Sequence, residues 1–172
     1  MNVIIETERL LLRTFTENDA ALLYELNHDP EVTRYTDDPM TTLDQAKKVL
    51  DEVILPQYIL YNHGRWAVHL KPHLEFIGWC GLKFLADRNE VDLGYRFMKK
   101  FWGKGYATEA AYACLEYGFK SLNLQLIVGR ALPENAGSIR VLEKCGMQFA
   151  CQETVHDLLH KTYHATNPAI QP

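Results

Sequence analysis

The segment VDLGYRFMKKFWGKGYATEAA, residues 91–111, joins a strand-like pattern to a helix-like pattern through a glycine-rich turn. Gly103 and Gly105 occupy that turn, directly before the helical pattern begins. The first N–H groups of a helix have no intrahelical acceptor and lie at the positive end of the helix dipole. Glycines let an anion approach these groups closely, and Lys104 adds positive charge. The segment therefore predicts a site for a phosphate group at the start of a helix.

Two other interpretations of this turn compete with a phosphate site of this kind. The first is a plain connection between a strand and a helix, because short glycine motifs also occur by chance. The second is a nucleotide-binding loop of another fold. The GxGxxG pattern fails because Thr108 stands at the third glycine, and GxxxxGK[ST] is absent. A nucleotide-binding module is therefore the least favoured function.

The composition is that of an ordinary globular chain. Of the 172 residues, 47% are hydrophobic and 23% are charged, which favours one domain over residues 1–172. The formal net charge of -4 argues against a nucleic-acid partner. No apolar run approaches the roughly 20 residues of a membrane helix, and MNVIIETERL lacks a secretion-signal pattern, so we expect a cytoplasmic protein with no membrane partner. The cysteines have no CxxC spacing, which predicts reduced thiols: Cys80, Cys114, Cys145 and Cys151.

Hydrophobic periodicity predicts strands and helices in an order typical of a mixed α/β (α+β) protein. Strands are predicted at residues 9–15, 65–70, 75–84, 90–98 and 124–132, with two further candidates between 147 and 166. Helices are predicted at residues 16–30, 41–54, 107–119 and 135–146. Short turns separate the three strands between residues 65 and 98, as expected for an antiparallel meander.

Two blocks of the sequence resemble one known family. Residues 91–111 resemble the acetyl-CoA-binding motif of the GNAT superfamily of N-acetyltransferases, and PENAGSIRVLEKCGM, residues 133–147, resembles the next block of that fold. TERLLLRTFTENDA and FIGWCGL are similar to the branch that includes the ribosomal-protein N-terminal acetyltransferases. The resemblance covers residues 8–166. It implies a single domain with a mixed, mostly antiparallel sheet of about six to seven strands and about four helices.

The resemblance also implies which residues bind acetyl-CoA. They are Tyr95, Arg96, Phe97, Gly103, Lys104, Gly105, Tyr106, Ala107, Thr108 and Asn135. The family's (Q/R)xxGx(G/A) pyrophosphate loop starts at Trp102, a departure that matters little if the loop binds through backbone groups. The backbone of residues 95–97 would pair with the pantetheine arm, and an amide near Phe97 would polarise the thioester carbonyl. Asn135 is also a plausible helix N-cap, and the two roles can coexist.

Acetyl transfer needs a base for the acceptor ammonium and a group that stabilises the leaving thiolate. Strand alternation places Glu90 and Asp92 on one face. Asp92 stands where many family members carry a glutamate base, so it is the first candidate and Glu90 the second, although strand carboxylates are often merely solvated. The family's tyrosine acid is replaced by Leu142. Ser138, one turn earlier, resembles a serine proposed as the acid in the ribosomal branch, and a capping hydroxyl is an equal alternative.

Three further features have a functional and a structural interpretation. His156, His160 and His164 would form a metal-binding stripe on a helix, but the β-rich KTYHAT predicts a strand, so no metal is expected. Cys145 is expected to belong to the core rather than to carry an acetyl group. Aromatic residues are expected to pack on the sheet, with some lining the acceptor cleft: Trp66, Trp79, Tyr95 and Phe97.

The favoured function is an acetyl-CoA-dependent N-acetyltransferase that acts by direct transfer in a ternary complex, as a monomer or a homodimer. The acceptor would be a peptide N-terminus or a small amine. Specificity is expected in residues 28–40, where Tyr35, Asp37 and Asp38 either attract a cationic amine or are simply solvated. The alternative is a CoA-binding sensor or scaffold without turnover, motivated by Leu142 and by the short side chain of Asp92.

Overall fold

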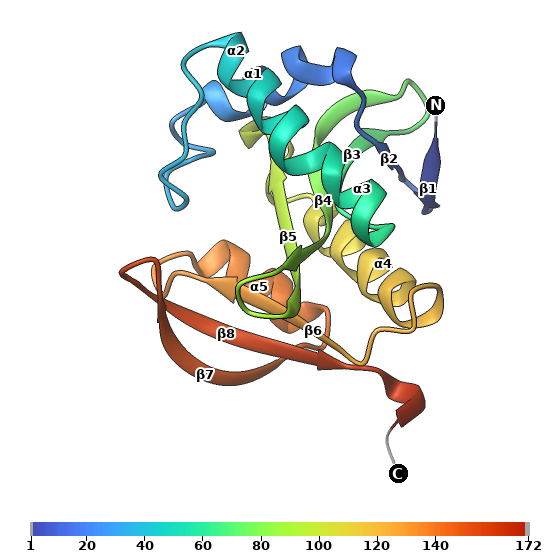
Figure 1. The fold of residues 1–172 in the computed structure, drawn as a ribbon, viewed down its shortest axis with the longest axis vertical. Helices are drawn as coiled ribbons and strands as arrows, with labels where there is room; N and C mark the ends of the chain where they lie inside the picture. The colour runs from blue at the N-terminus through green and yellow to red at the C-terminus, as the bar shows by residue number, and fades with distance from the viewer. Residues whose placement is uncertain (1, 171–172) are drawn as a thin grey trace.

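A single eight-stranded sheet forms the centre of the computed structural model, which describes residues 2–170 (Figure 1). The strands are β1 (Val3–Glu6), β2 (Leu10–Thr14), β3 (Arg65–Leu70), β4 (Glu75–Leu85), β5 (Glu90–Phe97), β6 (Leu126–Ala131), β7 (Gln148–Val155) and β8 (Leu158–Thr166). Their order in the sheet is β1-β2-β3-β4-β5-β6-β8-β7. All neighbouring strands are antiparallel except β5 and β6, which are parallel.

The helices are α1 (Ala20–His28), α2 (Leu43–Val49), α3 (Leu55–Tyr61), α4 (Tyr106–Lys120) and α5 (Ala136–Lys144). Helix α2 begins with a capping box, in which the Thr42 side chain accepts from the Gln45 amide. A π-helical segment, Leu50–Ile54, joins α2 to α3 without a break. The helical stretch ends at Asn62, which adopts the left-handed conformation with φ of 60°. None of the helices within residues 2–170 is long and apolar enough to cross a membrane.

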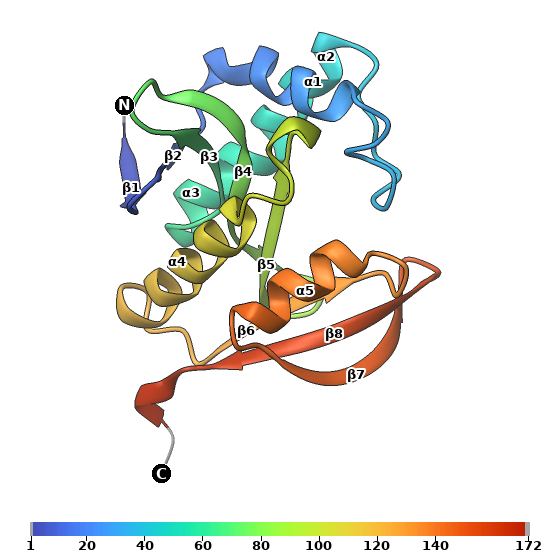
Figure 2. The same cartoon turned by 180° about the vertical axis from the view of Figure 1, so that it is seen from behind.

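The helices form two layers, and each layer buries its own hydrophobic cluster against the sheet (Figure 2). Helices α1, α2 and α3 cover one face of the β1–β5 half, with Leu26 and Leu50 fully buried. Helix α4 covers the other face and lies close to it because Gly118 carries no side chain. A Cβ at Gly118 would stand 2.6 Å from Ile127 Cδ1 and 2.9 Å from Leu82 Cδ1. Helix α5 continues that layer over the β6–β8 half.

The predicted mixed fold is confirmed, and the structure differs from the prediction in two details. The strand β1 is added at the edge, so the sheet has eight strands rather than six to seven. The helix predicted at residues 41–54 continues to Tyr61, since Pro56 falls in the first turn of α3, where its missing N–H is not needed.

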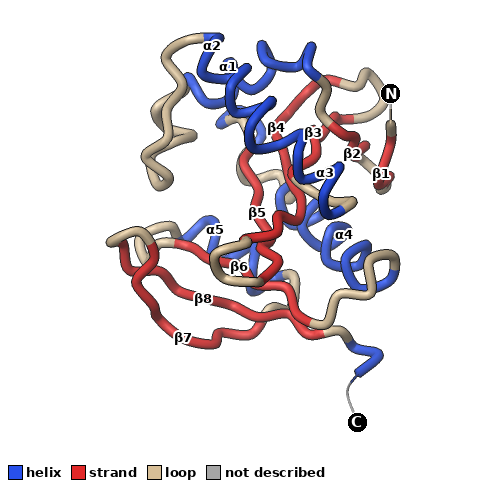
Figure 3. The backbone as a smooth tube through the Cα atoms, in the orientation of Figure 1, coloured by secondary structure: helices blue, strands red, loops and turns tan. Residues whose placement is uncertain are grey.

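The two halves of the sheet meet only briefly, at β5 and β6. These strands pair at Asp92 with Val128 and at Leu93 with Gly129, and within residues 2–170 no pair of β5 with β6 follows Leu93. Figure 3 shows the upper part of β5 running away from β6. The remaining residues of β5, Gly94–Phe97, pair with β4 on one side only. The backbone edge of β5 is therefore left open at the point where the glycine loop follows it.

Candidate functional site

The glycine loop leads from β5 into α4 in a left-handed conformation. Gly103 and Gly105 have φ of 74° and 81°, which L-residues with a side chain rarely adopt. Gly105 is the N-cap of α4, and the amide of Glu109 makes the first helical hydrogen bond, to the Gly105 carbonyl at 3.0 Å. The amides of Tyr106, Ala107 and Thr108 belong to the first turn, where a helix offers no acceptor. The loop thus presents the backbone donors that an anion needs.

Trp102 holds the start of this loop against the strand. Its indole Nε1 donates a hydrogen bond of 2.7 Å to the carbonyl of Phe97, the last residue of β5. The ring is 46% exposed, so this contact rather than burial fixes its position. The tryptophan thereby performs a structural role at the position where the family has Gln or Arg, and it leaves the amides of the loop free for a ligand.

Glu109 ties the first turn of α4 to the β1–β2 turn. Its carboxylate accepts from the Thr7 hydroxyl at 2.6 Å, the Arg9 amide at 3.0 Å and Arg9 Nε at 2.6 Å. Arg9 also donates to the Lys104 carbonyl at 3.0 Å. Burial alone would raise the pKa of Glu109, but these hydrogen bonds outweigh it and hold the pKa below its usual value. The Glu109 carboxylate therefore stays ionised and holds the start of α4 against the β1–β2 turn.

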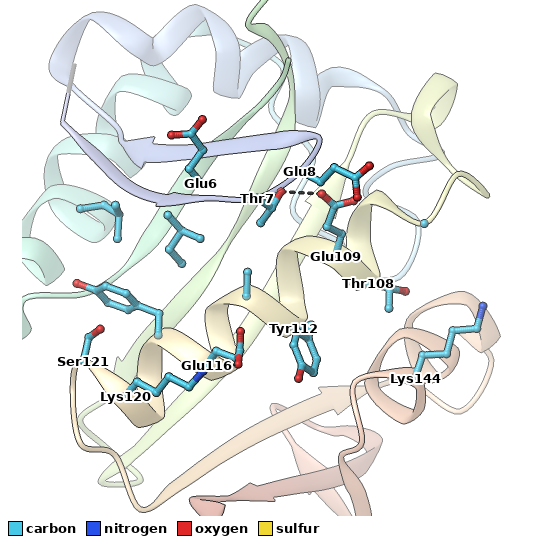
Figure 4. A pocket seen from close by; sticks show the side chains of 15 residues that line it. Glu6, Thr7, Glu8, Thr108, Glu109, Tyr112, Glu116, Lys120, Ser121 and Lys144 are labelled. Carbon is cyan, nitrogen blue, oxygen red and sulfur yellow. Dashed lines mark hydrogen bonds and ion pairs between the residues drawn. The ribbon is translucent and has the colours of Figure 1, made fainter. Parts of the chain in front are cut away.

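A groove of about 840 Å³ runs from this loop along α4 (Figure 4). Its floor is the outer surface of α4, and β1 with the following turn forms one wall. Figure 4 shows Thr108 and Tyr112 on α4, with Lys144 projecting from α5 on the other side. Carboxylates gather on the β1 side, where Glu8 lies near the Thr7–Glu109 hydrogen bond. Arg9 and Lys71 pair with Glu109 and Glu6, so the β1 side carries charges of both signs, and Lys144 adds a cation toward α5.

A second cavity, of about 210 Å³, lies where β5 and β6 diverge. It is lined by Tyr35, Thr36, Arg65, Trp79, Asp92, Leu93, Gly94, Tyr95, Arg96, Arg130, Ala131, Leu132, Asn135, Ser138 and His160. The structure thus brings together five of the predicted site residues in one place: Asp92, Tyr95, Arg96, Asn135 and Ser138. Glu90 does not line it.

Asp92 is bound by a guanidinium in this cavity. Arg65 forms an ion pair with its carboxylate and also donates to the Asp92 backbone carbonyl at 2.9 Å. Both side chains are 15% exposed. Gly94 makes room for the guanidinium, because a Cβ there would stand 2.5 Å from Arg65 Nη2. Gly94 therefore allows Arg65, which lies on β3 beyond β4, to reach Asp92 on β5.

Glu90 belongs to a network of ion pairs on the same sheet face. It accepts from Arg88 at 2.9 Å and from Arg130 at 2.6 Å, and Arg130 also bonds Glu153 at 2.9 Å. Burial opposes ionisation of Glu153, but hydrogen bonds from Thr162 and the two arginines prevail and lower its pKa to about 2. Glu90 thus has two guanidinium partners that bind its carboxylate and keep it from the cavity.

Ser138 lies at the α5 side of the cavity, next to Tyr95. The Tyr95 phenol donates to the Ser138 carbonyl at 2.8 Å, so the serine hydroxyl donates to the phenol oxygen, 3.0 Å away. Burial raises the pKa of Tyr95, which keeps the phenol protonated. Asn135 caps α5 by accepting from the Ser138 amide at 3.1 Å, which confirms the predicted N-cap. Leu142 is fully buried in the core.

Arg96, on β5, binds the loop between α1 and α2 at one side of the cavity. The Arg96 guanidinium lies 2.9 Å from Asp38 and 2.7 Å from the Thr36 hydroxyl. Asp38 is therefore paired with Arg96 rather than free for a cationic amine. Trp79 lies beneath two guanidinium groups, with Arg65 at 5.2 Å and Arg96 at 5.5 Å from its ring centroid. Of the four aromatics considered, Trp79 and Tyr95 line the cavity, whereas Trp66 and Phe97 are core residues.

The histidines and Cys145 occupy the places that their structural interpretations predict. His160 and His164 lie on strand β8 and His156 in the preceding turn. Within residues 2–170 no group of three or more His, Cys, Asp or Glu side chains is placed to hold a metal ion. Burial raises the pKa of Cys145 to about 12, so its thiol stays protonated at neutral pH and is a poor nucleophile.

Sequence reasoning assigned no role in the cavity to three charged or titratable residues that line it: Arg65, Arg130 and His160. Arg65 and Arg130 come from strands that the sequence predicts correctly, but nothing in their local pattern shows that they reach β5. Strand alternation alone could have placed Arg130 on the face opposite Ile127 and Gly129. His160 was considered only as part of a histidine stripe.

Comparisons with known proteins agree with this geometry. A family model described as an acetyltransferase (GNAT) domain matches residues 9–148. The uncharacterized N-acetyltransferase p20 of Bacillus licheniformis is 36% identical over 144 residues, covering 83% of this chain and 80% of that protein. The crystal structure of a GNAT-family acetyltransferase from Bacillus anthracis superposes with a TM-score of 0.81 at 27% identity, over 95% of this chain and 98% of that one.

Two more distant structures share the fold. A ribosomal-protein-S5-alanine acetyltransferase from Vibrio fischeri has a TM-score of 0.80 at 19% identity, over 98% of both chains. A spermidine N-acetyltransferase from Vibrio cholerae, in complex with CoA and spermine, has a TM-score of 0.76 at 19% identity. That likeness covers 94% of this chain and 97% of the other.

Proposed function

Because the chain belongs to the GNAT family of acetyltransferases, we propose that it transfers an acetyl group from acetyl-CoA directly to a primary amine in the cavity between β5 and β6. The observation that carries this proposal is the cavity itself. It lies beside the open edge of β5, the strand that leads into the glycine loop at the start of α4. The family membership makes the protein an acyltransferase. The acceptor, the direct transfer and the residues that bind CoA are proposals.

The pyrophosphate of CoA would bind at the first turn of α4. Two left-handed glycines and the unpaired amides of residues 106–108 support this position, as does the Arg9–Glu109 anchor behind the loop. The pantetheine arm would lie along the open backbone edge of residues 94–97, as an added strand does. Tyr112 and Lys144 offer an aromatic ring and a cation to the adenosine end of the groove.

The loop assignment is tested by Gly105→Asp with Gly146→Asp as a matched control. Both glycines have a φ near +80°, and a Cβ at Gly146 meets nothing within 4 Å while one at Gly105 comes only as near as 3.5 Å to Arg9. The backbone strain is therefore similar, but only position 105 places a carboxylate against the phosphates. We expect acetyl-CoA to bind roughly 30-fold or more weakly to Gly105→Asp by calorimetry, since a carboxylate beside the phosphates costs about 2 kcal/mol of binding free energy. Equal affinities in the two variants would disprove the loop assignment.

The acceptor is a single primary amine of modest size. The cavity of about 210 Å³ is smaller than the usual site for a drug-sized ligand, and it must also admit the acetyl end of the thioester. A small amine or the terminal residue of a peptide meets this limit. Asp92 and Ser138 face the cavity and remain predictions for the base and the acid, and Glu90, outside the cavity, is a weaker candidate.

A panel of amines tests the activity against the alternative of a CoA-binding sensor. The panel contains small amines, spermidine and short peptides with free N-termini, and the readout is release of free CoA thiol. Acceptor-dependent release supports the transferase. Tight binding of CoA with no release for any amine would support the sensor instead.

We also propose that the chain forms one domain over residues 1–172, with its core at residues 8–166, and works in the cytoplasm as a monomer or homodimer.

A further inference from the structure

His160, at the start of β8, lines this cavity and has no ion-pair partner among residues 2–170. Imidazole is the side chain that most often serves as a general base. The two carboxylates nominated by the sequence are both bound by guanidinium groups, Asp92 by Arg65 and Glu90 by Arg88 and Arg130. An acceptor ammonium would have to compete with those arginines. We propose that His160 is the general base that deprotonates the acceptor amine, which rests on the proposed function.

The hydrogen bonding of His160 defines which ring nitrogen acts. Nδ1 lies 2.9 Å from the backbone carbonyl of Leu158. A carbonyl oxygen can only accept, so Nδ1 donates its proton and Nε2 carries the lone pair. The acceptor carbonyl belongs to the residue two positions earlier on the same strand. This bond favours the Nδ1–H tautomer of His160 without help from another side chain. The neutral ring therefore presents an acceptor nitrogen before substrate arrives.

The charges around His160 are paired with one another rather than with its ring. Glu153 stands directly opposite on β7, and its carboxylate is bound to Arg88, Arg130 and the Thr162 hydroxyl. From β6, Arg130 lines the same cavity and is held by Glu90 and Glu153. Asp92 on β5 is bound to Arg65. The charged neighbours on the three strands form ion pairs among themselves, which leaves the imidazole to exchange its proton with substrate.

The reaction balances with His160 in this role. The acceptor ammonium gives one proton to Nε2, and the nitrogen lone pair then forms the C–N bond with the thioester carbonyl carbon. The C–S bond breaks as the tetrahedral intermediate collapses, and the second proton lost by the nitrogen ends on the CoA sulfur. The imidazolium returns its proton to solvent. The products are the amide, CoA thiol and one proton.

The kinetic test compares His160→Gln with His164→Gln, a matched control four residues later on the same strand. The acceptor is the amine of the panel that wild type uses best. We expect His160→Gln to lose about 100-fold or more in kcat/KM at pH 7.5, the usual scale of general-base catalysis, and His164→Gln to keep wild-type activity. The deficit should shrink as pH rises, because the acceptor then loses its proton without help. A deficit that is constant with pH, or no deficit, would overturn the role of His160.

Two measurements separate this role from a structural one and from failure of the proposed function. Asp92→Asn is expected to lose less kcat/KM than His160→Gln, and the reverse order would return the role to Asp92. Nitrogen-15 NMR of the histidine side chains reads the tautomer without any acceptor. A neutral Nδ1–H form of His160 at pH 7.5 supports the proposal, and an Nε2–H form or an imidazolium would overturn it. Absence of CoA release by wild type with every amine would overturn the proposed function itself.

Discussion

The two halves of the sheet are stabilised in different ways. The β1–β5 half is covered on both faces by helices, and its core contains side chains such as Leu12, Trp66 and Leu82 that are almost completely buried. The β6–β8 half is covered by α5 on one face only (Figures 1 and 2). Its other face carries Arg130 and Glu153 in ion pairs, and most of β7 is exposed. Because the halves separate between β5 and β6, ion-paired side chains of both halves line the cavity: Arg65, Asp92 and Arg96 on one side and Arg130 on the other.

Different titratable groups have shifted pKa values in the two halves. In the covered half, burial lowers the pKa of His63 and of His69, so both rings are neutral inside the core. In the partly covered half, hydrogen bonds keep Glu153 ionised far into the acid range. The two histidines and Glu153 should therefore contribute to stability in different pH windows.

The largest expected difference between the halves is in the free energy of unfolding that is lost when a leucine is replaced by alanine. Leu82→Ala should lower the free energy of unfolding by about 2–5 kcal/mol, because Leu82 is fully buried between β4 and α4. Leu159→Ala makes the same change on β8, where the side chain is 48% exposed, and should cost less than about 1 kcal/mol. Urea unfolding with a common m-value measures both. Similar costs would mean that the β6–β8 half is packed as tightly as the other.

An intermediate effect is expected from Glu153→Gln. At pH 7 the variant should lose roughly 1–2 kcal/mol, since hydrogen bonds to a charged group are replaced by weaker ones. The pKa of Glu153 is lowered to about 2, so the unfolded chain takes up this proton at a higher pH than the folded chain does. Its stabilisation is therefore present above about pH 4.5 and is lost as pH falls toward 2. Unfolding free energies between pH 5 and 2.5 should fall less steeply in the variant, and an unchanged slope would contradict the assignment.

The smallest effect is expected from the buried histidines. The pKa of His69 is lowered by burial, so the unfolded chain binds a proton that the folded chain does not, and stability falls as pH drops below about 6.5. The change should be about 1 kcal/mol or less between pH 7.5 and 5.5. His69→Phe should flatten this dependence, while His73→Phe, at an exposed position, should leave it unchanged. If both variants kept the wild-type dependence of stability on pH, groups other than His69 would be responsible for it.

Much of the fold was predictable from local pattern. Residues 91–111 contain a strand, a phosphate-type loop and a helix in order, and the GNAT family predicted from them is confirmed. The edge strand β1 escaped prediction because Val3–Glu6 is short and its pairing with β2 is irregular. The extension of α2 through a π segment to Tyr61 was also missed, since the apolar period was followed only to Ile54.

The sequence by itself determined the family, the position of the glycine loop and the capping role of Asn135, because each depends on residues close together in the chain. Only the tertiary structure decided which groups near the cavity are already bound. Arg65 reaches Asp92 from 27 positions away, through the space left by Gly94. His160 lines the same cavity from β8, without an ion-pair partner among residues 2–170. Whether a carboxylate or an imidazole is free to exchange a proton depends on such long-range contacts, which leave no local pattern in the sequence.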